Sequence, residues 1–301
     1  MAVGSMPQAG GKPGLSRTLL VVLIVALIVG GVVVVAAVLF LEPSLSPTVT
    51  KRFTPYSTPV PQNNSPTKEL SVGDINGDLT ISGWSQSNVL INGTITAKGL
   101  GANPDAISFV ESNSSGDIIF NAVFPPSTFL FSPSYTVDIN VYVPTSPNLI
   151  ALVASTVNGN IEASSLNEPS SADFTVTNGN LSVSNITTSD MGLIDTNGNI
   201  YLACSASCYG VAASTTNGAI TAAFKSLSYT GSYTFISTNG SIDLKVPASG
   251  SFKITANTTN GSISSSGLAV QLTNHIQATI GMGTATFSAT TTNGSVVVTG
   301  I

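Results

Sequence analysis

The chain has 301 residues, of which 42% are hydrophobic and only 8% are charged, whereas about a quarter of the residues in ordinary soluble proteins are charged. Its net charge of −5 at pH 7 argues against a nucleic-acid partner, because binding a polyanion needs basic patches that release counterions. Serine and threonine together contribute 77 residues, so the polarity of the chain comes mainly from neutral groups. The few carboxylates also suit an acidic surrounding, in which paired acids would be protonated and lost as stabilisers.

The first elements predicted along the chain are a short cytoplasmic tail at residues 1–17 and a transmembrane helix at residues 18–41. From Leu19 to Leu41 the chain runs for 23 residues without a charge, and at about 1.5 Å per residue a helix of that length spans a bilayer. The stretch is too long for the apolar region of a signal peptide, so it favours a retained single-pass anchor. All 14 acidic residues follow it, which supports a C-terminal part outside the cytoplasm.

Glycosylation sequons also occur only after the predicted span. Asn-x-Ser/Thr sites act only outside the cytoplasm, so they too favour an extracytoplasmic C-terminal part and a glycoprotein. The candidate sites are Asn92, Asn113, Asn180, Asn185, Asn239, Asn257, Asn260 and Asn293.

Residues 42–68 contain six prolines among serines and threonines. This composition buries no core and favours extended polyproline II, so it predicts a stalk. The stalk would carry an extracytoplasmic domain at residues 69–301.

The main feature of that domain is an Asn-Gly pair that recurs about every 20 residues. The pairs are Asn158-Gly159, Asn178-Gly179, Asn197-Gly198, Asn217-Gly218, Asn239-Gly240, Asn260-Gly261 and Asn293-Gly294. Four and six residues before each Asn, and three and five after it, the chain is apolar, with Ser265 as the one exception. This period of two on both sides predicts strand, corner, strand, and glycine supplies the positive φ that a sharp corner needs.

These units predict an all-β, single-chain β-solenoid of about 20-residue rungs, because only stacked repeats place the same turn in the same environment at near-constant spacing. The corner asparagines, and the threonines that precede six of them, would then form ladders. Residues 69–301 would give about eleven rungs, spaced at about 4.8 Å, with a degenerate unit near Gly281–Gly283. The alternative is a sandwich of β-hairpins, since Asn-Gly is also a strong hairpin signal.

The chain resembles a family of adhesin-like domains of unknown function found in bacterial and archaeal envelope proteins, which are related to autotransporter-adhesin head domains. The residues that carry the resemblance are Gly73–Ile81 with Gly83-Trp84, the strand Tyr135–Pro144 leading to Thr156–Ile161, and the serial Thr-Asn-Gly-x-Ile units. The resemblance implies a β-solenoid on the outer face of a membrane and brings no catalytic residues.

Few residues of the chain are suited to catalysis or metal binding. His275 is the only histidine, which excludes a His-dependent triad or a multi-histidine metal site within one chain, and we expect no cofactor. Cys204 and Cys208 are the only cysteines, and they form either a disulfide across a tight turn or two free thiols. The carboxylates that a polysaccharide-cleaving β-helix would use are Asp173, Asp190, Asp195 and Asp243, and their differing offsets from the repeat predict that stacking does not pair them.

We therefore expect a non-enzymatic, membrane-anchored cell-surface protein with an adhesive or envelope-structural role. Its partners would be the membrane, surface polysaccharide, envelope proteins or further copies of itself, but not nucleic acid. The alternatives are a pilin-like filament subunit, because a basic leader precedes a long apolar helix, and a polysaccharide-active β-helix enzyme.

Overall fold

The computed structural model describes residues 47–60, 67–114, 116–126, 132–145, 149–167, 170–205, 208–269 and 276–301. The chain divides into two compact units, Met1–Pro47 and Thr48–Ile301, of which the second is described. Apart from one 3-10 turn at Pro104–Ala106, the regular elements in these ranges are β-strands, so the predicted all-β class is confirmed for them. The helix predicted at residues 18–41 lies outside the described residues, and none of the described helical segments has the length and hydropathy of a membrane span.

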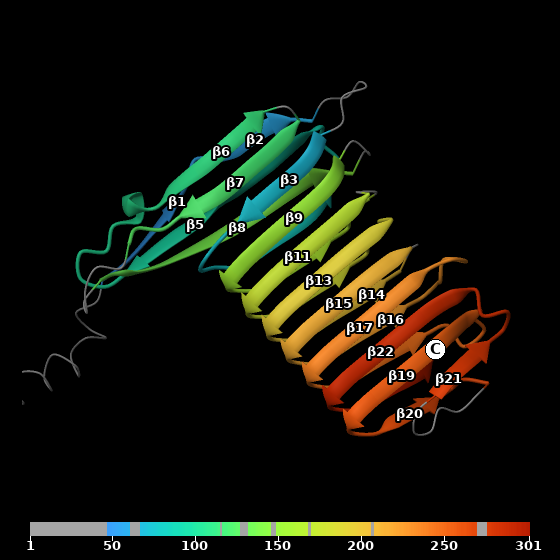
Figure 1. The fold of residues 1–301 in the computed structure, drawn as a ribbon. Coiled ribbons are helices and arrows are strands. Elements are labelled where there is room, and N and C mark those ends of the chain that lie inside the picture. The colour runs from blue at the N-terminus through green and yellow to red at the C-terminus, as the bar shows by residue number, and fades with distance from the viewer. Residues whose placement is uncertain are drawn as a thin grey trace, which may run out of the picture. The chain divides into compact units, whose positions relative to one another are not determined.

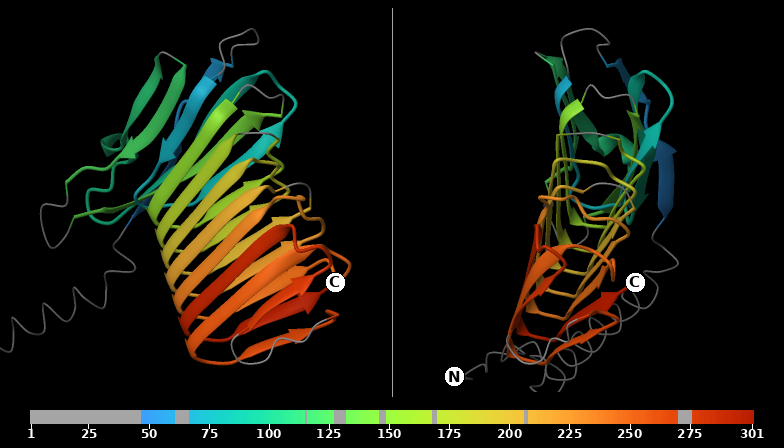
Figure 2. Two further views of the ribbon diagram at one scale, coloured as in Figure 1. Left: turned by 45° about the vertical axis from the view of Figure 1, so that its right-hand side comes forward. Right: turned by 90° about the vertical axis from the view of Figure 1, so that its right-hand side faces the viewer.

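The strands form two sheets that face each other (Figures 1 and 2). Sheet A contains, in spatial order, β1 (Thr48–Arg52), β5 (Asn88–Lys98), β8 (Ser134–Pro144), β4 (Leu79–Trp84), β10 (Ile161–Ser164), β12 (Leu181–Ser184), β14 (Ile200–Cys204), β16 (Ile220–Phe224), β18 (Ile242–Val246), β23 (Val296–Gly300) and β20 (Ile263–Ser266), while β2 (Tyr56–Pro59) pairs with β5. Sheet B contains β21 (Ile276–Ile280), β19 (Phe252–Asn260), β22 (Ala285–Asn293), β17 (Ser232–Asn239), β15 (Gly210–Asn217), β13 (Asp190–Asn197), β11 (Ser171–Asn178), β9 (Leu149–Asn158), β3 (Thr67–Gly73), β7 (Asp117–Val123) and β6 (Ser108–Ser114).

Each Asn-Gly corner joins a strand of sheet B to the next strand of sheet A, and this unit is one rung of a solenoid. Neighbouring rungs pair in parallel with Asn opposite Asn, as Asn178 does with Asn158 and Asn197. The parallel pairing rules out the hairpin alternative, in which the two strands beside each corner would pair with each other. Stacked rungs instead place every corner on the one before it (Figure 1).

The described residues contain eight such rungs, from β3–β4 to β19–β20, rather than about eleven. The shortfall arises at the N-terminal end of the sheets. There the antiparallel pairs β5–β8 and β6–β7 extend sheets A and B in place of Asn-Gly rungs. The long strands β5 and β8 pair with each other along their length and need no Asn-Gly corner. They therefore extend sheet A and use residues that were predicted to form further rungs.

The core lies between the two sheets and follows the predicted period of two. Every apolar position that the repeat predicted to face inward is buried, and Ser265 is partly buried. Aromatic rings fill the C-terminal half, where Phe224, Tyr233 and Phe287 contact one another with centroids 4.5–5.4 Å apart. Fully burying one such side chain contributes about 1.5–3 kcal/mol, so the inward faces supply the main stabilisation of the stack.

Close packing between rungs requires glycine at every corner, whereas a positive φ occurs only at Gly77, Gly159 and Gly179, which corrects the sequence-based explanation. A Cβ atom on Gly198 would lie 1.5 Å from the carbonyl oxygen of Gly179, and one on Gly218 would lie 1.8 Å from that of Gly198. From Gly198 onward the corner glycines do not have a positive φ. Each rung therefore rests its corner directly on the backbone of the rung before it, and no side chain fits between them.

Part of the predicted stalk belongs to the folded domain, which corrects its boundary. Residues 48–59 form β1 and β2, and both strands pair antiparallel with β5. Phe53 between them is buried, and its ring centroid lies 4.5 Å from that of Phe109 with the ring planes tilted by 44°. The prolines of this segment had suggested an extended linker, but Pro59 ends β2 on the edge of the sheet, where a missing N–H breaks no ladder.

The last rung in the sequence is not the last rung in space. Strands β22 and β23 insert between β17–β18 and β19–β20, so residues 285–300 lie inside the stack. The degenerate rung expected near Gly281–Gly283 is wrong, because residues 276–280 form β21, which pairs antiparallel with the outer edge of β19. The spacing of 33 residues between Asn260 and Asn293 is longer than the others because the chain forms β21 before it re-enters the stack as β22.

Candidate functional site

The corner asparagines form a continuous hydrogen-bonded ladder along one edge of the solenoid. Each side-chain Nδ2 donates to the Oδ1 of the Asn in an adjacent rung, at 2.6 Å from Asn158 to Asn76 and 2.7–2.8 Å elsewhere. Amide groups suit this role because each has both a donor and an acceptor. The predicted asparagine ladder is thus present and extends to Asn76, which stands at its N-terminal end.

A second ladder, two residues after the first, was not found by sequence reasoning. Its members are Asp78, Asn160, Asn180 and Asn199, called here the amide row. Each side-chain Oδ1 accepts from the backbone N–H of the next rung, at 2.7 Å for Asp78 and Asn160 and 2.9 Å for Asn199 and Ala219. The signal was visible as Asn-Gly-Asn or Asn-Gly-Asp in four consecutive corners, but the third residue was not compared between repeats.

Hydroxyl groups two residues before the corner Asn form a third, buried column. Thr156, Thr215, Ser237 and Thr291 donate to the corner-glycine carbonyl of the rung before, at 2.8–3.2 Å. The threonines predicted to form a ladder were those directly before the Asn, which instead face outward and are mostly exposed. Sequence reasoning chose the wrong member of a repeated Thr-Thr-Asn pattern, because a shift by one residue changes the face of a strand.

Two rungs carry an aspartate in this buried column in place of a hydroxyl. Asp195 is 2% exposed and Asp74 is 6% exposed. Burial raises the pKa of each carboxyl from 3.8 to about 6, although nearby backbone N–H groups lower it in part. Within the described residues, Asp74 Oδ1 accepts from the Ile75 N–H at 2.8 Å, whereas Asp74 Oδ2 and both oxygens of Asp195 have no partner in hydrogen-bonding geometry.

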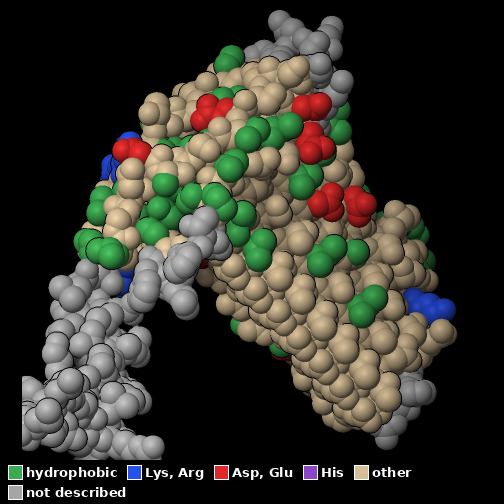
Figure 3. Space-filling model, turned by 60° about the vertical axis from the view of Figure 1, so that its left-hand side comes forward, with side chains coloured by type: hydrophobic (Ala, Val, Ile, Leu, Met, Phe, Trp, Pro, Cys, Tyr) green, Lys and Arg blue, Asp and Glu red, His purple; other side chains and the backbone are tan. Residues whose placement is uncertain are grey.

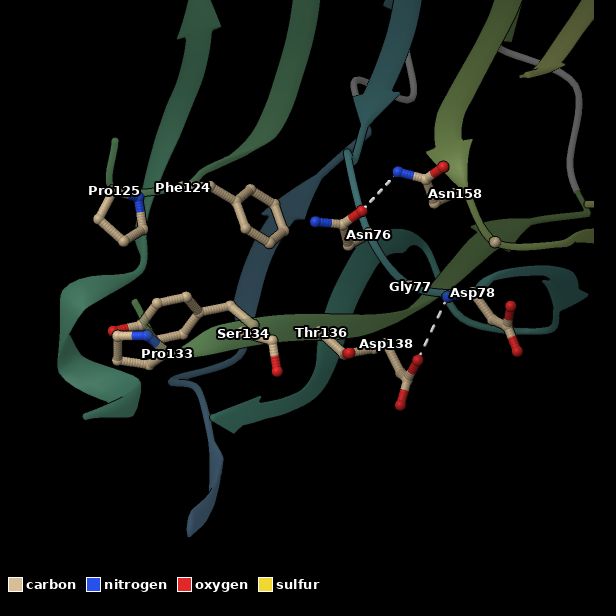
Figure 4. A pocket seen from close by; sticks show the side chains of 12 residues that line it. Asn76, Gly77, Asp78, Phe124, Pro125, Pro133, Ser134, Thr136, Asp138 and Asn158 are labelled. Carbon is tan, nitrogen blue, oxygen red and sulfur yellow. Dashed lines mark hydrogen bonds between the residues drawn. The ribbon is translucent and has the colours of Figure 1, made fainter. Parts of the chain in front are cut away.

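A pocket of about 640 Å³ opens where the asparagine ladder begins (Figure 4). We call it the corner pocket, and it is lined by Asn76, Gly77, Asp78, Phe124, Pro125, Pro133, Ser134, Tyr135, Thr136, Asp138, Asn158 and Gly159. Figure 4 shows its apolar wall, with Phe124 and Pro125, facing Asn76 across the opening. Below Asn76, the Oδ1 of Asp138 accepts a hydrogen bond from the backbone N–H of Asp78 at 3.2 Å.

A groove of about 480 Å³ continues from Asp78 along the amide row. Its floor is formed by the outward residues Thr80, Glu162, Ser182 and Tyr201 of the neighbouring strands β4, β10, β12 and β14, which lie side by side in register. The Tyr201 ring is 46% exposed. Asp78 lines both the corner pocket and the groove, so the two hollows share a wall.

The structure joins Cys204 and Cys208 by a disulfide, with their Cα atoms 6.2 Å apart. Cys204 ends β14, and both side chains are buried in the core. The hydroxyl of Tyr233 donates to the carbonyl oxygen of Cys208 at 2.7 Å. The pair therefore closes the turn after β14, at the end of the strand away from its Asn-Gly corner, and does not line the pocket or the groove.

The four carboxylates that an enzyme would use are not gathered in one site. Asp195 is in the buried column, and Asp243 lies on the outer side of sheet A. Asp173 and Asp190 lie on the neighbouring strands β11 and β13, and burial together with the Asp190 charge raises the pKa of Asp173. The two are not register partners, because Asp173 lies opposite Gly192 and Asp190 lies opposite Ser171.

The described residues contain no group of three or more His, Cys, Asp or Glu side chains placed to hold a metal ion. His275 lies outside the described residues. Four candidate glycosylation sites are members of the ladders, namely Asn180, Asn239, Asn260 and Asn293. Asn92, Asn113, Asn185 and Asn257 lie elsewhere, and glycosylation at all eight stays a prediction.

The fold and these ladders define a parallel β-solenoid with a repeated, hydrogen-bonded corner. A family model for Toastrack DUF4097 matches residues 59–299, and the chain belongs to this family. The match confirms the predicted membership of a family of β-solenoid domains of unknown function. No curated protein matches the chain.

Several solved structures are similar to the chain at low sequence identity. A candidate cell adhesion protein from Clostridium sporogenes is 12% identical with a TM-score of 0.39, and the match covers 83% of this chain and 100% of that one. A candidate adhesin from Bacteroides fragilis is also 12% identical, with a TM-score of 0.37 and coverage of 85% and 97%. A candidate lipid binding protein from Parabacteroides distasonis is 12% identical, with a TM-score of 0.36 and coverage of 84% and 96%.

Proposed function

We propose that this protein is a non-catalytic, membrane-anchored β-solenoid that displays a repetitive surface outside the cell, in an adhesive or envelope-structural role. The observation that carries the proposal is the repeated display of neutral polar groups on consecutive rungs. The corner edge presents the asparagine ladder and the amide row, and exposed threonines stand beside it. Figure 3 shows one face of the domain on which uncharged side chains dominate.

Repetition is the physical basis of such binding. When the same group recurs at every rung, weak contacts to a repeating partner act together, and their combined affinity exceeds that of any one contact. A rigid arrangement strengthens the effect, because the groups are already ordered before the partner arrives. The ladders provide this order, since each amide is held by its neighbours at 2.6–2.8 Å.

Adhesion of cells that carry the full chain tests the proposal. Cells with and without the protein would be compared for attachment to purified envelope material, and external protease would report whether residues 48–301 are outside. We expect attachment to depend on the protein and the domain to be cleaved from outside. Equal attachment by both cells, or full protection from protease, would overturn the proposal. Release of oligosaccharide from the envelope material would instead favour the enzyme alternative, with Asp173 and Asp190 as its carboxylates.

A filament subunit is the second candidate, and the free strand edges favour it. In the described residues β20 ends sheet A and β21 ends sheet B, so both present unpaired backbone groups that a second chain could extend. Removing the C-terminal residues would not test this, because β22 and β23 are internal. Electron microscopy of a variant with proline at Ser264 on β20 tests it: filaments that persist unchanged would contradict assembly through this edge.

A further inference from the structure

We infer that the corner pocket and the adjoining groove form one binding site for an oligosaccharide that carries no acidic groups. This inference rests on the proposed function and names the ligand class of its adhesive surface. The corner pocket would hold the terminal sugar, and the groove the units that follow along the rungs.

The corner pocket pairs an apolar wall with a polar one, as sugar recognition requires. Sugars have apolar faces edged by hydroxyls, so they pack on flat apolar groups while polar side chains bind their edges. Phe124, Pro125 and Tyr135 supply the apolar side, and Ser134 and Thr136 add hydroxyls. Both surfaces are formed before a ligand arrives, so little ordering opposes binding.

Asn76 provides an unused donor in this pocket because it is the terminal member of its ladder. Its Oδ1 accepts from Asn158 at 2.6 Å, but its Nδ2 donates to no described residue. In Figure 4 this nitrogen points toward the Phe124 side of the pocket. Every other Asn of the ladder donates one Nδ2 hydrogen to a neighbour, so an amide nitrogen with both hydrogens available is specific to this position.

Carboxylates determine which sugars are accepted. Asp78 and Asp138 line the corner pocket, Asp78 and Glu162 line the groove, and no Lys or Arg is among the described residues that line either one. One oxygen of Asp138 accepts from Asp78 N–H, which leaves the other to accept from a sugar hydroxyl or ammonium. Acidic sugars would be repelled, because like charges at such short range are unfavourable.

The groove repeats at a spacing that suits a chain of sugars. Its amide row and its floor each supply one side chain per strand, and neighbouring strands are about 4.8 Å apart, close to the length of one hexose unit. Each amide nitrogen of Asn160, Asn180 and Asn199 uses one hydrogen in the ladder and has a second for a ligand. Tyr201, at the far end, offers an exposed ring for stacking.

Titration calorimetry on the full chain in detergent tests the inference with three probes: neutral chitohexaose, its cationic deacetylated hexamer, and anionic hexagalacturonate. We expect the first two to bind and the third not to bind. Thr136→Arg, which fills the corner pocket, should weaken binding at least about tenfold, a change typical of losing a central contact. Thr292→Arg makes the same replacement at an exposed position on a distant rung and should leave affinity unchanged.

Two further variants separate the parts of the site. Asp138→Asn keeps an acceptor for Asp78 N–H and removes the charge, so it should weaken the cationic hexamer more than chitohexaose. Tyr201→Ala should weaken the hexamers several-fold but leave the disaccharide chitobiose unchanged, whereas Tyr229→Ala, at an exposed ring outside the groove, should change neither. Folding of each variant would be checked by circular dichroism.

The inference is overturned if neither chitohexaose nor its deacetylated form binds, if hexagalacturonate binds better, or if Thr136→Arg binds as the unmodified chain does. Its failure is distinguishable from failure of the proposed function. Cells that still attach through a protein without oligosaccharide affinity would refute this site alone, and oligosaccharide binding without attachment would refute the adhesive role alone.

Discussion

Replacing Asp195 by threonine should make the protein more stable at neutral pH. Five other rungs place a hydroxyl at this position, where it donates to the corner-glycine carbonyl of the adjacent rung. Asp195 makes no such bond when it is ionised, and its neighbours in register are Val176 and Thr215, which offer no countercharge. Threonine would therefore restore the bond and remove a buried charge.

The magnitude follows from the pKa of Asp195, which burial raises from 3.8 to about 6. A pKa shift of that size corresponds to a loss of at most about 3 kcal/mol in the free energy of unfolding when Asp195 is ionised. The folded state binds the Asp195 proton more tightly than the unfolded state does. The protonated Asp195 therefore adds fully to the free energy of unfolding below pH 4, and this addition is lost as the pH rises to 6. We expect Asp195→Thr to be more stable at pH 7 by up to about 3 kcal/mol, or about 10 °C in Tm.

Urea denaturation between pH 3 and pH 8, followed by circular dichroism, measures this difference. The free energy of unfolding of the unmodified chain should fall from pH 4 to pH 6, and that of Asp195→Thr should fall less. Part of the fall that remains in the variant comes from Asp74, because burial raises its pKa to about 6 as well. Glu162→Thr, at an exposed position of β10 whose register neighbours Thr80 and Ser182 are uncharged, is the control. The reasoning is refuted if Asp195→Thr keeps the full slope or is less stable than the unmodified chain at pH 7.

Three further predictions concern the stack itself. Gly198→Ala should lower the free energy of unfolding by about 3 kcal/mol, because its Cβ would overlap the Gly179 carbonyl oxygen. Gly192→Ala is the control and should cost less, because its Cβ meets only the movable Asp173 side chain. Equal urea midpoints for the two variants would contradict this reasoning. Cys208→Ser should lower the free energy of unfolding by about 2 kcal/mol, which is the loop-closure contribution of a disulfide across a short loop. Reducing the disulfide of the unmodified chain should cause the same loss, and an unchanged free energy of unfolding in the variant would contradict the prediction. Deleting residues 281–301 removes an internal rung, so hydrogen exchange should show that β19–β21 lose protection; retained protection would show that they do not need β22.

The rung was predictable because it depends on local chemistry repeated many times. Apolar residues at fixed offsets from each Asn-Gly pair fall on one face of a strand, and equal spacing brings equal residues together when rungs stack. For these reasons the solenoid, its inward residues and the asparagine ladder could all be inferred without coordinates. The same reasoning misplaced the threonine column, because neighbouring residues in a strand face opposite sides and a repeated Thr-Thr does not show which one is buried.

The sequence by itself determined the class of fold, the size of the rung and the side chains between the sheets, since these follow from a period of two and a period of about 20. Only the tertiary structure decided the order of the rungs, the use of residues 48–59 as edge strands and the insertion of β22–β23. Each of these features is a pairing between strands that are distant in the sequence. Strand backbones can form the same hydrogen bonds in several different orders, so the sequence pattern does not select one order. The corner pocket has the same origin. Phe124, Asn76 and Asp138 are far apart in the chain, and they meet only because the antiparallel strands end where the ladder begins.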